Sequence, residues 1–138
     1  MNQTDELTGT IVLVHPDLTK DPAGRPGEVG VITGLDQHGD NAYVSFGKSG
    51  QLIYGLDALL VPRSPAEIQE ILSKHHSKLS VADHTALFRI ALLQDYKPST
   101  VNIKTAFSLA LQSETVRKYG MQSVQEAFNL QQEYYMER

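Results

Sequence analysis

The chain of 138 residues contains no cysteine and no tryptophan. Without cysteine there can be no disulfide framework, no thiolate ligand for a metal and no cysteine nucleophile. No apolar run approaches the roughly 20 residues that a membrane-spanning helix needs. Residues 1–6 are polar and acidic, whereas a secretion signal begins with basic and then apolar residues. These absences predict a soluble, cytoplasmic protein.

Basic side chains are scarce in the first half of the sequence. Residues 1–62 hold three of them, Lys20, Arg25 and Lys48, against eight acidic side chains, which gives a net charge of −5. Residues 63–138 hold nine basic against eight acidic side chains, a net charge of +1. Because a surface that binds phosphates needs clustered lysine and arginine, the first half argues against nucleic-acid binding.

The pattern of the sequence changes near residue 62. Before it, short runs rich in Val, Ile, Leu and Tyr alternate with glycine, proline, aspartate and asparagine, which predicts strands at residues 10–14, 29–35, 42–46, 51–54 and 58–61. Beyond Pro65 the chain contains one further proline, Pro98, and one glycine, Gly120. Apolar residues there recur every three or four positions, as in helices. We therefore expect a strand-rich domain at residues 1–62 and a helical domain at residues 63–138.

Two segments of the first half carry a resemblance to a known group of folds. They are Gly27-Glu28-Val29-Gly30-Val31-Ile32-Thr33-Gly34 and Ala42-Tyr43-Val44-Ser45-Phe46. With one long first connection, two hairpins and a short turn before the last strand, the region resembles the SH3-like barrels of KOW and translation proteins. The resemblance implies a five-stranded SH3-like β-barrel, and it covers less than half of the chain. Residues 63–138 resemble no family.

Four helices are expected after the change of pattern, at residues 65–77, 81–95, 100–119 and 124–136. Ser64-Pro65-Ala66-Glu67 combines a cap residue, a proline at the first helical position and a glutamate that can reach back to the cap. Ser113-Glu114-Thr115-Val116 also has the form of a helix start, so the third helix is either continuous or broken there. The helix at 81–95 is apolar on most sides, and we expect it to be central, with Leu92 in the core. The fold class is therefore α+β, a barrel followed by a four-helix part.

No set of residues in the sequence predicts catalysis, a cofactor or a metal site. His75 and His76 are consecutive and point about 100° apart on a helix, so the two side chains cannot both reach one ion together with His84. The string Gly47-Lys48-Ser49-Gly50 lacks the upstream glycine of a phosphate-binding loop and lies between two strands. Ser64, Ser80, Ser99 and Ser123 are explained as helix caps, and no Gly-x-Ser-x-Gly motif occurs. We expect a protein that is not an enzyme.

Protein binding is the function that the remaining features favour. The period of two along residues 42–46 separates Tyr43 from Ala42 and Val44, so the ring of Tyr43 or of Tyr54 should be exposed. The resemblance implies that a peptide would bind there, beside the long loop that contains His15 and Arg25. The sequence thus predicts an interaction module or adaptor that uses these four residues. Three alternatives stay open: rings that merely pack on the protein, an RNA- or ribosome-associated factor, and a structural homo-oligomer.

Overall fold

The computed structural model describes residues 7–17, 26–47, 50–94 and 98–127. The chain divides into two compact units. The sheet unit comprises Met1–Val61 and Ser123–Arg138, and the helical unit comprises Pro62–Gln122. Each unit is described by itself, within the described residues.

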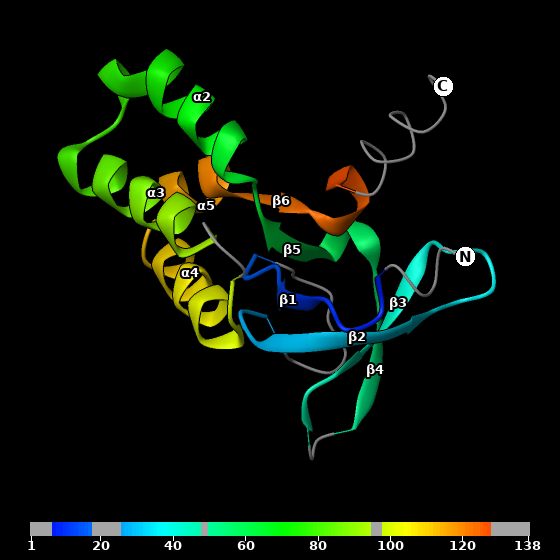
Figure 1. Cartoon of the computed structure of the whole chain (residues 1–138). Coiled ribbons are helices and arrows are strands. Elements are labelled where there is room, and N and C mark those ends of the chain that lie inside the picture. Colours follow the sequence, from blue (N-terminus) through cyan, green and yellow to red (C-terminus); the bar gives the residue numbers. More distant parts are fainter. Residues whose placement is uncertain (1–6, 18–25, 48–49, 95–97, 128–138) are drawn as a thin grey trace. The chain divides into compact units, whose positions relative to one another are not determined.

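The strands form one open sheet with the order β4-β3-β2-β1-β5-β6 (Figure 1). Antiparallel pairs join β1 to β2, β2 to β3, β3 to β4 and β1 to β5. A single turn of 3₁₀ helix, η2 (Leu56–Ala58), connects β4 to β5. The strands are β1 (Ile11–Val14), β2 (Val29–Leu35), β3 (Asn41–Ser45), β4 (Gln51–Gly55), β5 (Leu59–Pro62) and β6 (Met121–Ser123).

The mixed α+β class is confirmed, but the structure has an open sheet of six strands and does not confirm the predicted five-stranded barrel. A closed barrel has no edge strands, whereas β4 and β6 stand at the two ends of this strand order. The sixth strand, β6, is only three residues long. A segment that short, directly after a helix, has no period-two pattern of its own from which it could be predicted.

The core of the sheet unit follows the alternation of side chains along its strands. Every second residue of β3, Ala42 and Val44, is buried, and Tyr43 between them is exposed. The buried cluster also receives Val124, the first residue of a helical turn described from 124 to 127. Of the described residues, 123–127 therefore belong to the sheet unit. The rest of the predicted helix 124–136 lies outside the described residues. The cluster consists of Val12, Val14, Ile32, Ala42, Val44, Tyr54, Leu56, Leu59 and Val124.

Close packing between β2 and β3 depends on a glycine. A Cβ atom on Gly30 would lie 2.5 Å from Cγ1 of Val44 and 3.0 Å from Cε1 of Phe46, well inside van der Waals contact. A few residues further along β2, the register with β3 shifts between Ile32 and Gly34. Such a bulge adds one unpaired residue and increases the local twist of the strand.

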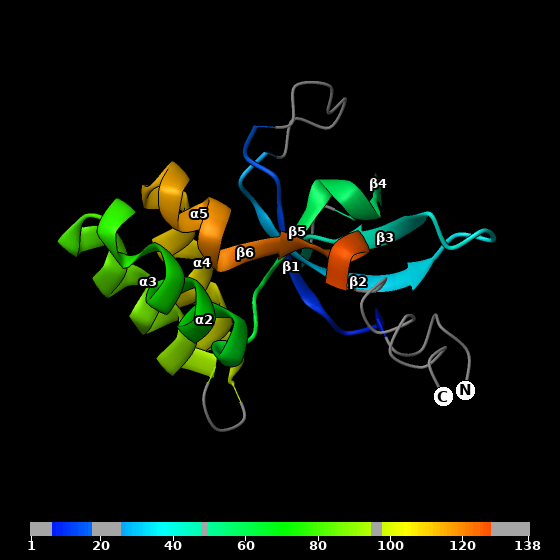
Figure 2. The same ribbon diagram turned by 90° about the horizontal axis from the view of Figure 1, so that it is seen from above.

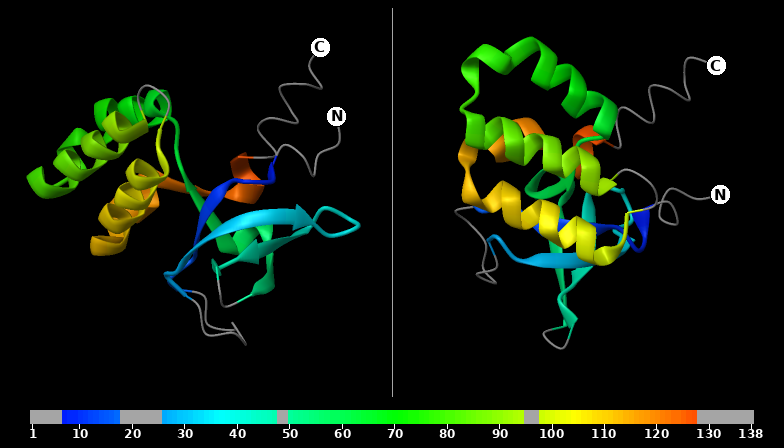
Figure 3. Two further views of the ribbon diagram at one scale, coloured as in Figure 1. Left: turned by 60° about the horizontal axis from the view of Figure 1, so that its bottom comes forward. Right: turned by 60° about the vertical axis from the view of Figure 1, so that its left-hand side comes forward.

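Four α-helices and one turn of 3₁₀ helix make up the helical unit. They are α2 (Pro65–His75), η3 (His76–Lys78), α3 (Val81–Gln94), α4 (Thr100–Gln112) and α5 (Glu114–Gly120). The break that Ser113 allowed in the third predicted helix is confirmed, because Ser113 separates α4 from α5. Figure 2 shows the four α-helices gathered together, and α3 and α4 lie side by side in both views of Figure 3.

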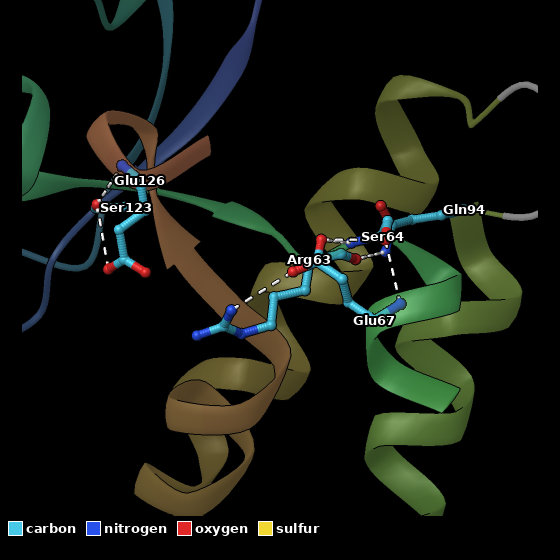
Figure 4. Close-up of polar contacts among 6 residues, drawn as sticks. All are labelled: Arg63, Ser64, Glu67, Gln94, Ser123 and Glu126. Atoms are coloured by element: carbon cyan, nitrogen blue, oxygen red, sulfur yellow. Dashed lines mark hydrogen bonds and ion pairs between the residues drawn. The ribbon is translucent and has the colours of Figure 1, made fainter. Parts of the chain in front are cut away.

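Serine side chains begin most of these helices. The Ser64 hydroxyl accepts a hydrogen bond from the Glu67 amide at 3.2 Å, and the Glu67 carboxylate accepts one from the Ser64 amide at 3.3 Å, a complete capping box (Figure 4). In the sheet unit, Ser123 accepts from the Glu126 amide at 3.0 Å in the same way. Because the first amides of a helix have no partner within the helix, these hydroxyls set the residue at which each helix begins.

The helix α3 is central to its unit, as its composition predicts, but its buried face is narrower than expected. It packs against α2, α4 and α5, and Leu87, Ile90 and Ala91 are buried. Leu92, predicted to lie in the core, is 53% exposed. A helix that is apolar on most sides does not define which side is buried, so the sequence could not place Leu92.

We expect the substitution Gly30→Ala to destabilise the sheet unit by about 1–3 kcal/mol, the usual effect of forcing an extra methyl group into a packed core. Val44 is fully buried and has little room to move. The matched control is Gly34→Ala, because a Cβ there would meet no atom within 4 Å. Urea unfolding of both variants measures the difference, and equal midpoints would show that β2 and β3 do not pack as described.

We expect Ser113→Ala to destabilise the protein by about 0.5–2 kcal/mol, the usual effect of removing a helix cap. The Ser113 hydroxyl accepts from the Val116 amide at 3.2 Å and donates to the Asp83 carboxylate at 2.9 Å. The control is Ser73→Ala, an exposed position inside α2, where alanine has the better helix propensity. A melting temperature that falls in neither variant would contradict the cap.

Candidate functional site

The outer face of the strands β2, β3 and β4 carries exposed apolar side chains. Tyr43 and Ile53 are directly opposite each other in the register of β3 and β4, and 40% and 53% of their surfaces are exposed. Val31 on β2 is exposed on the same sheet. We call the residues Val31, Thr33, Tyr43, Gln51 and Ile53 the Tyr43 face.

The buried side chains of the same strands force Tyr43 and Ile53 outward. Successive side chains of a strand point to opposite faces. The neighbours of Tyr43 on β3, Ala42 and Val44, are fully buried, and Tyr54, which follows Ile53 on β4, is 6% exposed. A change of register by one residue would expose the core, so the arrangement of the Tyr43 face is strongly specified.

Polar side chains connect the three strands across this face. The Thr33 hydroxyl, at the bulge of β2, donates to the carbonyl oxygen of Tyr43 at 3.2 Å. The side-chain amide of Gln51 on β4 donates in turn to the Thr33 hydroxyl. These two hydrogen bonds connect β4 to β2 across β3, and we call Thr33 and Gln51 the polar border of the Tyr43 face.

The strand β4 is also an edge of the sheet. The amide of Leu56 donates to the carbonyl of Asp40 at 3.2 Å, and that of Phe46 donates to the carbonyl of Gly50 at 3.3 Å. Hydrogen-bonded and non-hydrogen-bonded pairs alternate in an antiparallel ladder. The bonds of β4 to β3 therefore belong to Leu52 and Tyr54. The N–H and C=O groups of Gln51 and Ile53 and the N–H of Gly55 point away from β3, and no described segment pairs with β4 on that side. The C=O of Gly55 accepts the first hydrogen bond of the 3₁₀ turn η2.

Carboxylates lie at the Gly55 end of this strand. The Asp57 carboxylate approaches Gly55 so closely that a Cβ there would lie 2.7 Å from Oδ1. The backbone of Asp40 pairs with that of Leu56 at the same end, and both aspartates are exposed.

The carboxylate of Asp36 in the neighbouring hairpin is already bound by hydrogen-bond donors of the same hairpin. Its carboxylate accepts hydrogen bonds from the side-chain amide of Asn41 at 2.8 Å and from the backbone amides of Asn41 and Asp40. The Asn41 side chain has the largest effect, and together these donors lower the pKa of Asp36 below its ordinary value.

Of the three predicted site residues that the structure describes, Tyr43 alone lies on this face. Tyr54 belongs to the core cluster and makes an edge-to-face contact with Phe46, with ring centroids 6.1 Å apart. His15 is half-buried and its Nδ1 accepts from the Asp17 amide at 3.1 Å. Arg25 lies outside the described residues. As predicted, one of the two tyrosine rings is exposed.

Ile53 is the site residue that the sequence reasoning missed. The period of two along β4 places Ile53 on the face opposite to Leu52 and Tyr54, but this pattern does not show which of the two faces is exposed. The exposure of Ile53 has the same cause as that of Val31 and Tyr43 on the inner strands: no described residues bury this face of β2, β3 and β4.

The helical unit also exposes large apolar side chains, among them Phe88 and Leu92, which lie four residues apart on α3 and are 42% and 53% exposed. The His75 ring stacks on the Tyr119 ring with centroids 5.3 Å apart, and the Lys118 ammonium lies 5.2 Å from the centre of that ring. Over the described parts of the chain, histidine and acidic side chains form no group of three or more that could hold a metal ion. Each helix that the structure describes is too short or too polar to cross a membrane.

No protein family, no curated protein and no solved structure matches the chain.

Proposed function

We propose that this protein is a non-enzymatic interaction module that binds another protein through the Tyr43 face. The observation that carries the proposal is the pair of Tyr43 and Ile53. These two large side chains are opposite each other on the adjacent strands β3 and β4, and both are exposed. Tyrosine is a favoured anchor at protein interfaces because it offers a large, rigid, partly apolar surface. The polar border of Thr33 and Gln51 supplies hydrogen-bonding groups around it.

We also propose that the sheet unit is related in its strand order to SH3-like folds. We take β1 to β5 to be an SH3-like strand order in an open sheet. The support is the succession of a long β1–β2 connection, two hairpins and a 3₁₀ turn before β5, together with the pairing of β5 with β1. Proteins with this strand order often bind peptides on an exposed aromatic face, which agrees with the proposed use of Tyr43.

The charge of the sheet unit favours a protein partner over a nucleic acid. Its described residues contain no lysine or arginine, and a phosphate backbone is bound by clusters of these residues. The described acidic side chains of the unit are Asp17, Glu28, Asp36, Asp40, Asp57 and Glu126.

The test is an affinity capture from native lysate at low and high salt, with and without nuclease. We expect a protein captured by the unmodified chain to survive nuclease and high salt, and to be lost at least about tenfold with Tyr43→Ala, the effect of removing an interface anchor worth more than about 1 kcal/mol. The matched control is Phe88→Ala, an aromatic residue of α3 with a similar exposure of 42%, which should leave capture unchanged. Equal loss in both variants, or capture that disappears with nuclease, would contradict the proposal.

A further inference from the structure

The outer edge of β4 carries backbone groups with which no described strand pairs. Gln51 and Ile53 direct both their backbone N–H and C=O groups away from β3, and Gly55 its N–H, because these residues alternate with the residues that bond to β3. Such a row of backbone groups is complementary to another extended strand. Over five residues it is roughly 17 Å long, enough to pair with a short linear segment.

This edge lacks the features that usually prevent pairing. Sheet edges are commonly protected by a charged residue, a proline, a bulge or a covering element. The strand β4 contains no charged residue and no proline, and the bulge of this sheet lies in β2, away from the edge. Ile53, at the centre of the strand, is more than half exposed, so it offers an apolar contact to whatever pairs there.

The charge at one end of this edge favours a partner strand with a basic residue over a second copy of this chain. The exposed carboxylate of Asp57 lies beside Gly55, and it complements a lysine or arginine on the incoming strand. A second copy of this chain fits less well, because the described residues of its sheet unit bring no lysine or arginine to that end. A single pair of five-residue strands also buries little area compared with a stable dimer interface.

We propose that an extended segment of a partner protein adds to the outer edge of β4 as a further strand, with a lysine or arginine beside Gly55 and an apolar side chain beside Ile53. The inference rests on the proposed function and adds the conformation and charge of what the site binds. Backbone hydrogen bonds at Gln51, Ile53 and Gly55 supply the pairing. The apolar contact with Ile53 and Tyr43 fixes the position of the segment along the edge.

The test uses two blocked hexapeptides of alternating threonine and valine, one with lysine at both ends and one with glutamate at both ends. Each is titrated into the full chain while backbone amide shifts are followed by NMR. We expect the lysine peptide to shift the amides of Gln51, Ile53 and Gly55, and to bind at least about tenfold more tightly than the glutamate peptide. Absence of shifts along β4, or equal binding of both peptides, would overturn the proposal.

The matched variants are Ile53→Pro and Ile53→Ala. Both remove the isoleucine side chain, but only proline removes the outward N–H. Because that N–H takes no part in the β3 ladder, an edge strand tolerates the proline. We expect Ile53→Pro to weaken the lysine peptide at least about tenfold relative to Ile53→Ala, and equal binding would overturn strand addition. If Ile53→Pro does not fold, strand addition is tested by the amide shifts of the unmodified chain with the two peptides.

The same variants separate this inference from the proposed function. If the captured partner is lost with Tyr43→Ala but retained equally by Ile53→Pro and Ile53→Ala, the interaction face stands and strand addition fails. If capture is unaffected by Tyr43→Ala, the proposed function itself fails. A mass that rises with concentration and returns to the monomer value in Ile53→Pro would identify a second copy as the occupant and overturn the inference.

Discussion

The close packing of Gly30 against Val44 is the contact on which the sheet unit depends. Only a residue without a side chain leaves room for Val44 and Phe46 at that point, so this contact fixes how β2 lies on β3. Once that register is set, alternation along the strands buries Ala42, Val44 and Tyr54 and exposes Tyr43 and Ile53. The same alternation decides which backbone groups of β4 are bound by β3 and which point outward. Core, exposed face and free edge are therefore consequences of one register.

The helical unit is organised by a different interaction, the pairing of serine hydroxyls with the first amides of its helices. Ser64, Ser99 and Ser113 each accept a hydrogen bond from an amide three residues later. The Ser113 hydroxyl also donates to Asp83 of α3, so the cap of α5 connects two helices that are distant in sequence. Buried residues of α3, such as Leu87 and Ile90, then fill the space between the helices.

Local features were predictable from the sequence, and features that depend on distant pairing were not. The caps at Ser64 and Ser113 and the exposure of Tyr43 follow from residues within a few positions of each other. The open sheet does not, because β6 is a three-residue segment whose place is fixed only by pairing in the folded chain. The exposure of Ile53 was not predictable either, because the alternation along β4 does not show which face of the sheet stays uncovered. Leu92 was misplaced because its helix is apolar on both the buried and the exposed sides.

The most direct test of the free edge is amide hydrogen exchange of the unbound protein, resolved residue by residue along β4. The account predicts slow exchange at Leu52 and Tyr54, whose amides bond to β3, and faster exchange at Gln51, Ile53 and Gly55, whose amides point outward. Uniform protection of all five residues would mean that something already covers the edge. Slow exchange at Ile53 with fast exchange at Leu52 and Tyr54 would place the strand in the other register. Either result would contradict the account.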